Sequence, residues 1–219
     1  MQDVIGAALH RRQHRHQPLL HRLAELDPGE SVAPRLLAAT ALKIDDQQLA
    51  EFWFQRLKLA SPLDPTSYAG LAAIYLSRGE KTRALPELAE LANHETSDPR
   101  YALQLAAIYN EIKQPDQALV WLTEAMHIDP FNPATHLALA DAHLALNQPD
   151  EAVKENKVAI GLDADNDGYW ARLAFVYDAQ GKKDLARTAA RFAVRINPAS
   201  PAAALVAQPA APTSQPDGG

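Results

Sequence analysis

The chain has no cysteine and no long apolar run, and these two absences exclude several classes of protein. Without cysteine among its 219 residues it has no disulfide, no thiolate metal ligand and no cysteine nucleophile. No segment reaches the roughly 18 apolar residues that a membrane-spanning helix needs. Residues 1–18 contain charged residues and histidines where a secretory signal peptide has an apolar stretch. We therefore predict no membrane span, and a cytoplasmic protein if Met1 is the native start.

Positive charge and catalytic groupings are also scarce. Lysine and arginine number 21 against 27 acidic residues, which gives a net charge of -6. Such a chain lacks the sustained positive field that binding to nucleic acid requires. The histidines at 94, 127, 136 and 143 are spread over three predicted helices, with 136 and 143 on the same one, and there is no glycine-rich phosphate loop. We predict a non-catalytic protein with no cofactor, no metal site and no nucleic-acid partner.

A pattern of apolar and small residues recurs every 34 residues. Its fullest copy, between Asp167 and Pro198, places landmark residues at fixed offsets: Trp170, Leu173, Ala174, Tyr177, Gly181, Ala186, Ala190 and Ala193. The same offsets recur from Pro133, Pro99 and Pro65, and less completely from Ser31. Because all the copies keep one phase without insertion, they indicate a true internal repeat.

This pattern resembles the tetratricopeptide (TPR) repeat, a helix-turn-helix unit of 34 residues. The resemblance implies an all-α fold, a right-handed superhelical α-solenoid of TPR helix-turn-helix repeats, in which each unit buries its apolar face on its neighbours. We interpret residues 31–200 as five TPR-like repeats, namely 31–64, 65–98, 99–132, 133–166 and 167–200. Residues 1–30 are interpreted as a degenerate or partial N-terminal repeat. Residues 201–219 are interpreted as a short capping helix followed by a disordered Ala/Pro-rich tail.

Proline and cap-forming residues predict where the helices begin. The first helices are expected near 33–43, 66–78, 100–112, 134–146 and 168–180, and the second helices near 47–60, 82–93, 116–128, 150–162 and 184–196. A cap residue precedes a proline of the first helical turn at Asp64-Pro65, Asp98-Pro99, Asn132-Pro133 and Ser200-Pro201. Pro86 instead lies inside a predicted second helix, where it predicts a late start or a kink.

The TPR resemblance also implies that the first helices line a concave groove, with particular offsets facing it. From those offsets we select ten partner-binding residues: Arg35, Arg100, Leu103, Gln104, Asn110, Leu137, Asp141, Arg172, Phe175 and Asp178. Apolar side chains would form the floor, and the arginine and amide side chains would donate hydrogen bonds. The lysine and asparagine with which some TPR proteins clamp acidic chaperone tails are absent. A partner segment with apolar anchors and few charges therefore fits this lining better.

These residues favour a scaffold that binds a segment of another protein in the groove. One alternative is a self-associating module, a homo-oligomer that uses exposed apolar residues such as Trp53, Phe54 and Trp121. Another is an interaction domain excised from a larger protein that carries a further domain, catalytic or not, upstream. The pattern predicts a class of function, protein binding, and does not identify the partner.

Two motifs resemble parts of metal sites. His10 and His14 are one helical turn apart, which is a spacing for two metal ligands, but no third ligand is in phase with them. Asp163 to Gly168 begins like an EF-hand calcium loop, yet the twelfth position, where that loop has glutamate, holds Ala174. We interpret the histidines as a solvated helix face and the acidic residues as helix caps.

Overall fold

The structure, a computed structural model, describes residues 31–207. Residues 1–30 and 208–219, and with them the predicted N-terminal repeat, His10, His14 and most of the predicted tail, lie outside this part. The described residues form eleven α-helices and no strand. Contacts between residues divide the chain into two compact units, Met1–Thr96 and Ser97–Gly219.

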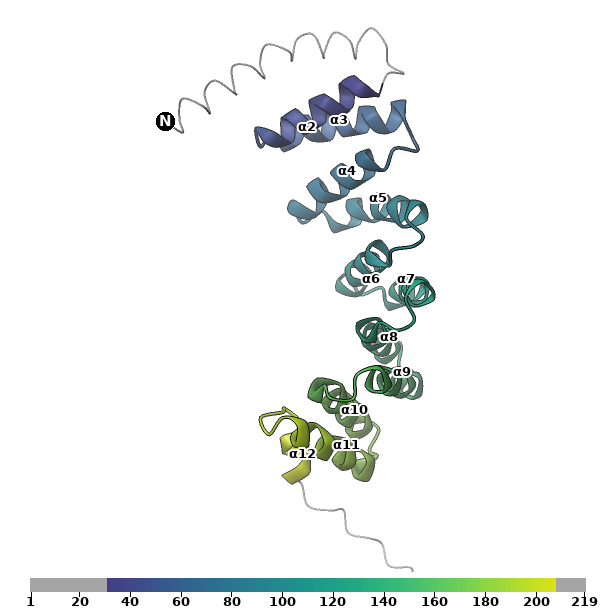
Figure 1. Cartoon of the computed structure of the whole chain (residues 1–219), viewed down its shortest axis with the longest axis vertical. Helices are drawn as coiled ribbons and strands as arrows, with labels where there is room; N and C mark the ends of the chain where they lie inside the picture. The colour runs from purple at the N-terminus through teal and green to yellow at the C-terminus, as the bar shows by residue number, and fades with distance from the viewer. Residues whose placement is uncertain (1–30, 208–219) are drawn as a thin grey trace, which may run out of the picture. The chain divides into compact units, whose positions relative to one another are not determined.

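The described part of the first unit, residues 31–96, contains two helix-turn-helix pairs: α2 (Val32–Lys43) with α3 (Gln47–Ala60), and α4 (Pro65–Ser77) with α5 (Lys81–His94). Helix α3 also packs against α4, so that each helix contacts the next one along the chain (Figure 1). The buried stripe of each helix supplies one fully buried leucine to the core: Leu37, Leu57, Leu71 and Leu88.

The second unit contains three more pairs and a short final helix: α6 (Arg100–Glu111), α7 (Pro115–Ile128), α8 (Pro133–Ala145), α9 (Pro149–Leu162), α10 (Asp167–Ala179), α11 (Lys183–Ile196) and α12 (Ala203–Ala207). Its core contains many alanines, among them Ala106, Ala140 and Ala174, which are 0–1% exposed. Small side chains here let paired helices approach closely, as the repeat pattern predicted. Helix α12 adds Leu205 to the apolar cluster of α10 and α11.

Every helix pair has the same turn, and the turn repeats at the interval of the sequence pattern. One residue per turn has a positive φ between 57° and 74°: Asp45, Gly79, Lys113, Asn147 and Gly181. In the turn at Gly79, its N–H bonds to the Leu76 carbonyl at 3.0 Å and the next N–H bonds to the Tyr75 carbonyl at 2.8 Å. This is a Schellman motif, which satisfies the last carbonyls of the first helix and reverses the chain.

The first helices of the repeats begin at, or within one residue of, the positions that the cap residues predicted. The side chains of Asp64, Asn132 and Asn166 each accept a hydrogen bond from the backbone N–H two residues further on, at 3.0 Å. Asp98 does the same for Arg100 at 2.9 Å. The first three are the N-caps of α4, α8 and α10, whereas α6 begins one residue later in the repeat, with Pro99 as its N-cap, so Pro99 does not lie in its first turn as predicted.

Two other predicted helix starts were wrong. Helix α5 runs from Lys81 with Pro86 inside it, so the predicted late start does not occur. Its first turn is held by two hydrogen bonds to the Glu80 carbonyl, and a proline at the sixth position removes only the later bond that its own N–H would make. The final helix begins at Ala203, so Pro201 does not lie in its first turn.

A side-chain donor near the start of a first helix reaches back six residues in three of the repeats. Tyr68 donates its hydroxyl to the Pro62 carbonyl at 2.7 Å, His136 donates Nε2–H to the Pro130 carbonyl at 3.0 Å, and Trp170 donates Nε1–H to the Ala164 carbonyl at 2.9 Å. The loop before each of these helices is thereby bonded to the helix that follows it. The same position of the repeat at 99–132 holds Ala102, which has no side-chain donor.

Candidate functional site

Four of the ten predicted site residues line two hollows of the second unit. The α6–α8 hollow has a volume of ≈ 430 Å³ and is lined by Asn110, Lys113, Pro115, Asp141 and Ala145. The α8–α10 hollow has a volume of ≈ 230 Å³ and is lined by Asp141, Leu144, Asn156, Arg172, Phe175, Val176 and Ala179. The two hollows share Asp141, so they adjoin along the first helices of three successive repeats.

The α8–α10 hollow combines exposed and buried apolar side chains. Phe175 is 45% exposed and Leu144 is 39% exposed, although both are large apolar residues, whereas Val176 is buried. Leu144 comes from the end of α8 and Phe175 from the middle of α10, one repeat further on. Large apolar residues placed beside a hollow in this way are a feature of surfaces that bind other molecules.

The predicted arginine donors already have carboxylate partners within the chain. Arg172 donates to Asp141 of the preceding repeat, and Arg35 of the first unit donates to Asp64. Arg100 Nε bonds to Asp98 Oδ2 at 2.5 Å, and Lys183 Nζ bonds to the predicted site residue Asp178 at 2.7 Å. The charged side chains in the α8–α10 hollow are therefore paired with each other, which leaves its apolar surface as the main feature.

The other predicted residues lie outside the linings of the two hollows. Leu103 packs partly buried against the core cluster of α6, α7 and α8. Gln104 is exposed and Leu137 is half-buried. Arg100 and Asp178, with the partners given above, also lie outside both linings, and Arg35 belongs to the first unit.

Seven lining residues were not among the ten predicted ones, and two of these seven, Lys113 and Asn156, are polar or charged. Lys113 is the residue of the α6–α7 turn with a positive φ. Asn156 is 1% exposed; its Nδ2 donates to the Ala152 carbonyl at 2.8 Å, and its Oδ1 has no hydrogen-bond partner in the described part of the chain. The sequence did carry a signal, because the same offset holds Phe54, Leu88 and Leu122 in the three preceding repeats.

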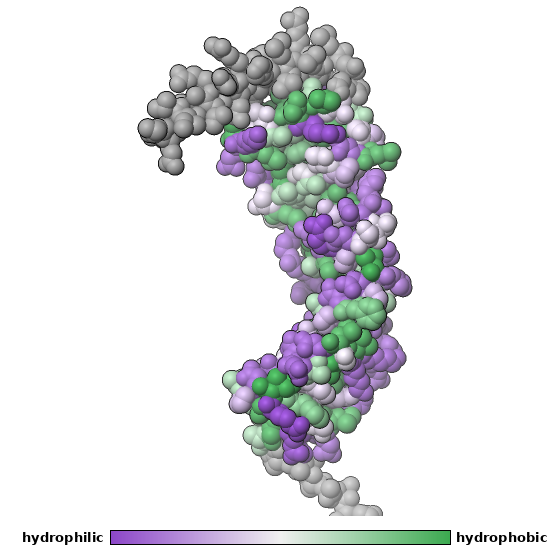
Figure 2. Space-filling model, in the orientation of Figure 1, coloured by the Kyte–Doolittle hydropathy of each residue, from purple (hydrophilic) through white to green (hydrophobic). Residues whose placement is uncertain are grey.

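The apolar residues proposed for self-association were partly wrong. Trp53 and Phe54 are 2% and 4% exposed, because both face the core of the first unit, and Trp121 is half-buried against the cluster of α6–α8. The most exposed large apolar residues are Leu59, Leu63 and Phe131, at 77–83%. Figure 2 shows apolar side chains in separate patches among polar ones on one face.

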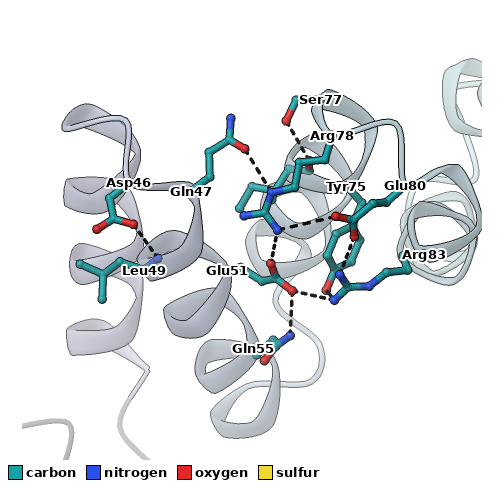
Figure 3. Close-up of polar contacts among 11 residues, drawn as sticks. Asp46, Gln47, Leu49, Glu51, Gln55, Tyr75, Ser77, Arg78, Glu80 and Arg83 are labelled. Atoms are coloured by element: carbon teal, nitrogen blue, oxygen red, sulfur yellow. Dashed lines mark hydrogen bonds and ion pairs between the residues drawn. The ribbon is translucent and has the colours of Figure 1, made fainter.

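A polar network joins the two repeats of the first unit. Glu51 of α3 accepts from Arg78 at 2.5 Å and from Arg83 at 2.6 Å, and Arg83 also bonds to Glu80 at 2.5 Å (Figure 3). Burial raises the pKa of Glu51, but the hydrogen bonds and charges of the two arginines outweigh it and hold the pKa below its usual value. Burial likewise raises the pKa of Asp64, but the hydrogen bonds from Thr66 and Arg35 outweigh burial, so the pKa of Asp64 also lies below its usual value.

In the segment Asp163–Gly168 the side chain that caps a helix is an amide, not one of the acidic residues that were predicted to do so. Asn166 caps α10, and Asp167 Oδ2 accepts from Asn197 Nδ2 at 3.1 Å. Within residues 31–207 no group of three or more histidine, aspartate and glutamate side chains is arranged to hold a metal ion. None of the helices described there is long and apolar enough to cross a membrane.

Helix pairs with one recurrent turn, one recurrent cap and core contacts between successive helices define a helix-turn-helix repeat protein. Residues 111–171 match the family model described as tetratricopeptide repeat. No curated protein sequence matches the chain.

Several solved structures share the fold at low sequence identity. YrrB, a TPR protein, has 13% identity and a TM-score of 0.66, over 85% of this chain and 96% of that chain. MamA has 14% identity and a TM-score of 0.63, over 77% and 92%. A thermophilic TPR protein from Thermus thermophilus has 21% identity and a TM-score of 0.52, over 81% and 99%. Residues 111–171 thus match a tetratricopeptide-repeat model, and residues 31–207 have the all-α fold of TPR solenoids.

Proposed function

We propose that this chain is a non-catalytic scaffold whose second unit binds a segment of a partner polypeptide along α6, α8 and α10. The observation that carries the proposal is the α8–α10 hollow, where Leu144 and Phe175 stay exposed beside a hollow of ≈ 230 Å³. The fold is consistent with this role, since YrrB is a TPR protein with an unusual peptide-binding site.

The lining indicates the chemistry of the partner segment. Complete burial of a leucine or phenylalanine side chain contributes about 1.5–3 kcal/mol, so covering two half-exposed ones favours binding by a smaller but useful amount. Arg172 and Asp141 neutralise each other, so a charged partner would have to break an existing ion pair. A segment with apolar anchors and few charges therefore suits this surface.

The test replaces the two apolar lining residues. A Leu144→Ala/Phe175→Ala variant should lose roughly tenfold or more in affinity for a partner captured by the full chain and then purified, because apolar anchors dominate such interfaces. Val120→Ala is the matched control: Val120 is 61% exposed on α7, outside both hollows, and its loss should leave binding unchanged. Equal affinity of the double variant and the wild type would refute the site.

Charge reversal tests the same surface independently. Arg172→Glu places two carboxylates where an ion pair now lies and should abolish binding while the helical circular dichroism signal stays intact. Arg100→Glu, outside both hollows, should have a smaller effect. If the two substitutions weaken binding equally, the α8–α10 hollow is not the centre of the site.

Self-association is a second proposal, favoured by Phe131, which is 77% exposed in the loop between α7 and α8. Light scattering over a concentration series separates the two proposals. A constant monomer mass would exclude self-association and leave the binding scaffold standing.

A further inference from the structure

We infer that the α8–α10 hollow is a subsite for an aromatic side chain that carries a hydrogen-bond donor, a tryptophan or tyrosine of the partner segment, with Asn156 Oδ1 as its acceptor. The inference rests on the proposed function, because it names the residue type that this surface selects.

Asn156 occupies a position of the repeat that is apolar in the other repeats. The equivalent residues of the other four repeats, Phe54, Leu88, Leu122 and Ala190, are all apolar and 0–4% exposed, so this position belongs to the core between helix pairs. Asn156 is just as buried but polar, and it is the most deeply buried residue in the lining of the hollow. A repeat selected only for stability would keep an apolar residue here, because a buried polar atom without a partner costs about 1–3 kcal/mol.

One hydrogen bond fixes the orientation of the Asn156 side-chain amide. Asn156 Nδ2 is held by the Ala152 carbonyl at 2.8 Å, which identifies the other end of the amide as the carbonyl oxygen. That oxygen has no hydrogen-bond partner in the described residues. The group missing at the most buried member of the lining is therefore a hydrogen-bond donor.

The size and polarity of the α8–α10 hollow limit which side chain can enter it. A cavity of about 150 Å³ holds a benzene ring in a protein interior, so ≈ 230 Å³ has room for a larger aromatic ring. Leu144, Phe175 and Val176 supply apolar contacts for such a ring. The lining has no uncompensated charge, since Asp141 and Arg172 are paired, so the entering group needs none. An indole or phenol ring meets all three requirements, and a phenylalanine ring lacks the donor.

The experiment uses two small probes that differ in one hydrogen-bond donor. Indole has an N–H donor, and 1-methylindole has the same ring system without it. Titration of the full chain, followed by NMR, should show both probes shifting Leu144, Phe175 and Val176, with indole bound roughly three- to tenfold more tightly. Equal affinity for the two probes, or no shift at these residues with either, would overturn the inference.

Two variants separate the acceptor from the hollow. Asn156→Ala keeps the space and removes the acceptor, so it should bind indole and 1-methylindole equally. Asn156→Leu installs the residue of two other repeats, so it should bind neither probe and should unfold at a higher temperature than the wild type, because a buried unpaired amide is gone. A donor preference that survives in Asn156→Ala would also overturn the inference.

The outcome is separable from that of the proposed function. If the Leu144→Ala/Phe175→Ala variant loses its partner while wild-type protein shows no preference for indole, the binding surface stands and the subsite assignment fails. If indole is preferred but the double variant keeps its partner, the hollow accepts donor-bearing aromatic rings and the partner binds elsewhere.

Discussion

At the residue scale, the contact between Gly70 and Phe54 shows how closely the helices of the first unit approach. A Cβ built on Gly70 of α4 would lie 2.4 Å from two ring atoms of Phe54 on α3. Phe54 is 4% exposed, so its ring has little room to move aside. The glycine thus sets the spacing between one repeat and the next.

Gly70→Ala should therefore destabilise the protein by about 1–3 kcal/mol, the usual cost of overpacking a core. Urea unfolding followed by circular dichroism measures it. The matched control is Gly161→Ala in α9, where an added Cβ meets nothing within 4 Å. That substitution should stabilise by up to about 1 kcal/mol, since alanine is the better helix former. A neutral Gly70→Ala would mean that Phe54 shifts at no cost.

At the scale of the helix, α5 shows that packing can override a local breaker. Pro86 lies in the sixth position of the helix and cannot donate to the Thr82 carbonyl. Ala84, Leu88 and Leu91 are nevertheless buried on one side of the helix. Their burial outweighs one missing hydrogen bond, which is why the helix that begins at Lys81 continues through Pro86.

Pro86→Ala restores the missing donor and should raise the free energy of unfolding by about 1–3 kcal/mol. Pro65→Ala is the control, because Pro65 occupies the first turn of α4, where its N–H would have no helical partner. Its effect should stay within about 1 kcal/mol of zero. Equal effects of the two substitutions in urea unfolding would show that helix position does not decide the cost of proline here.

The sequence predicts features that depend on residues nearby in the same repeat, and it does not predict features that depend on residues of another repeat. Helix positions followed from caps and small residues, because Asp64, Asn132 and Ala140 act through neighbours close in the repeat. The ion pair between Arg172 and Asp141 was not predicted, because it joins helices of different repeats. The offset of Asn156 marks it as a polar residue at an apolar position, but the hollow beside it and the lack of a donor for its oxygen in the described residues depend on the folded surroundings.

At the scale of the whole molecule, ion pairs join one repeat to the next within each unit. Lys58–Glu87 and Glu51–Arg78 do so in the first unit, and Asp141–Arg172 does so in the second. Arg35–Asp64 joins α2 to the residue that caps α4, the first helix of the following repeat. Repeat proteins are stabilised largely by such contacts between nearest neighbours. Losing the charge on the acidic partners should therefore weaken the coupling between repeats.

Acid should expose this dependence. The pKa values of Glu51 and Asp64 are lowered by folding, so both carboxylates stabilise the native state above their ordinary pKa, and that stability is lost as the pH falls through the lowered values. Urea unfolding between pH 7 and pH 3 should show a falling free energy of unfolding. Glu51→Gln should cost about 1–3 kcal/mol at pH 7 and flatten the profile. A variant with the wild-type slope would rule out Glu51 as a contributor.

The three aromatic side chains that reach back across a loop differ in size and shape but share a polar hydrogen. A phenol, an imidazole and an indole each donate to a backbone carbonyl, that of Pro62, Pro130 or Ala164. Ala102 breaks this series, and the carbonyl six residues before it belongs to Thr96, the last residue of the first unit. The boundary between the two units thus lies in a loop that lacks this hydrogen bond. We expect local unfolding on heating to begin there.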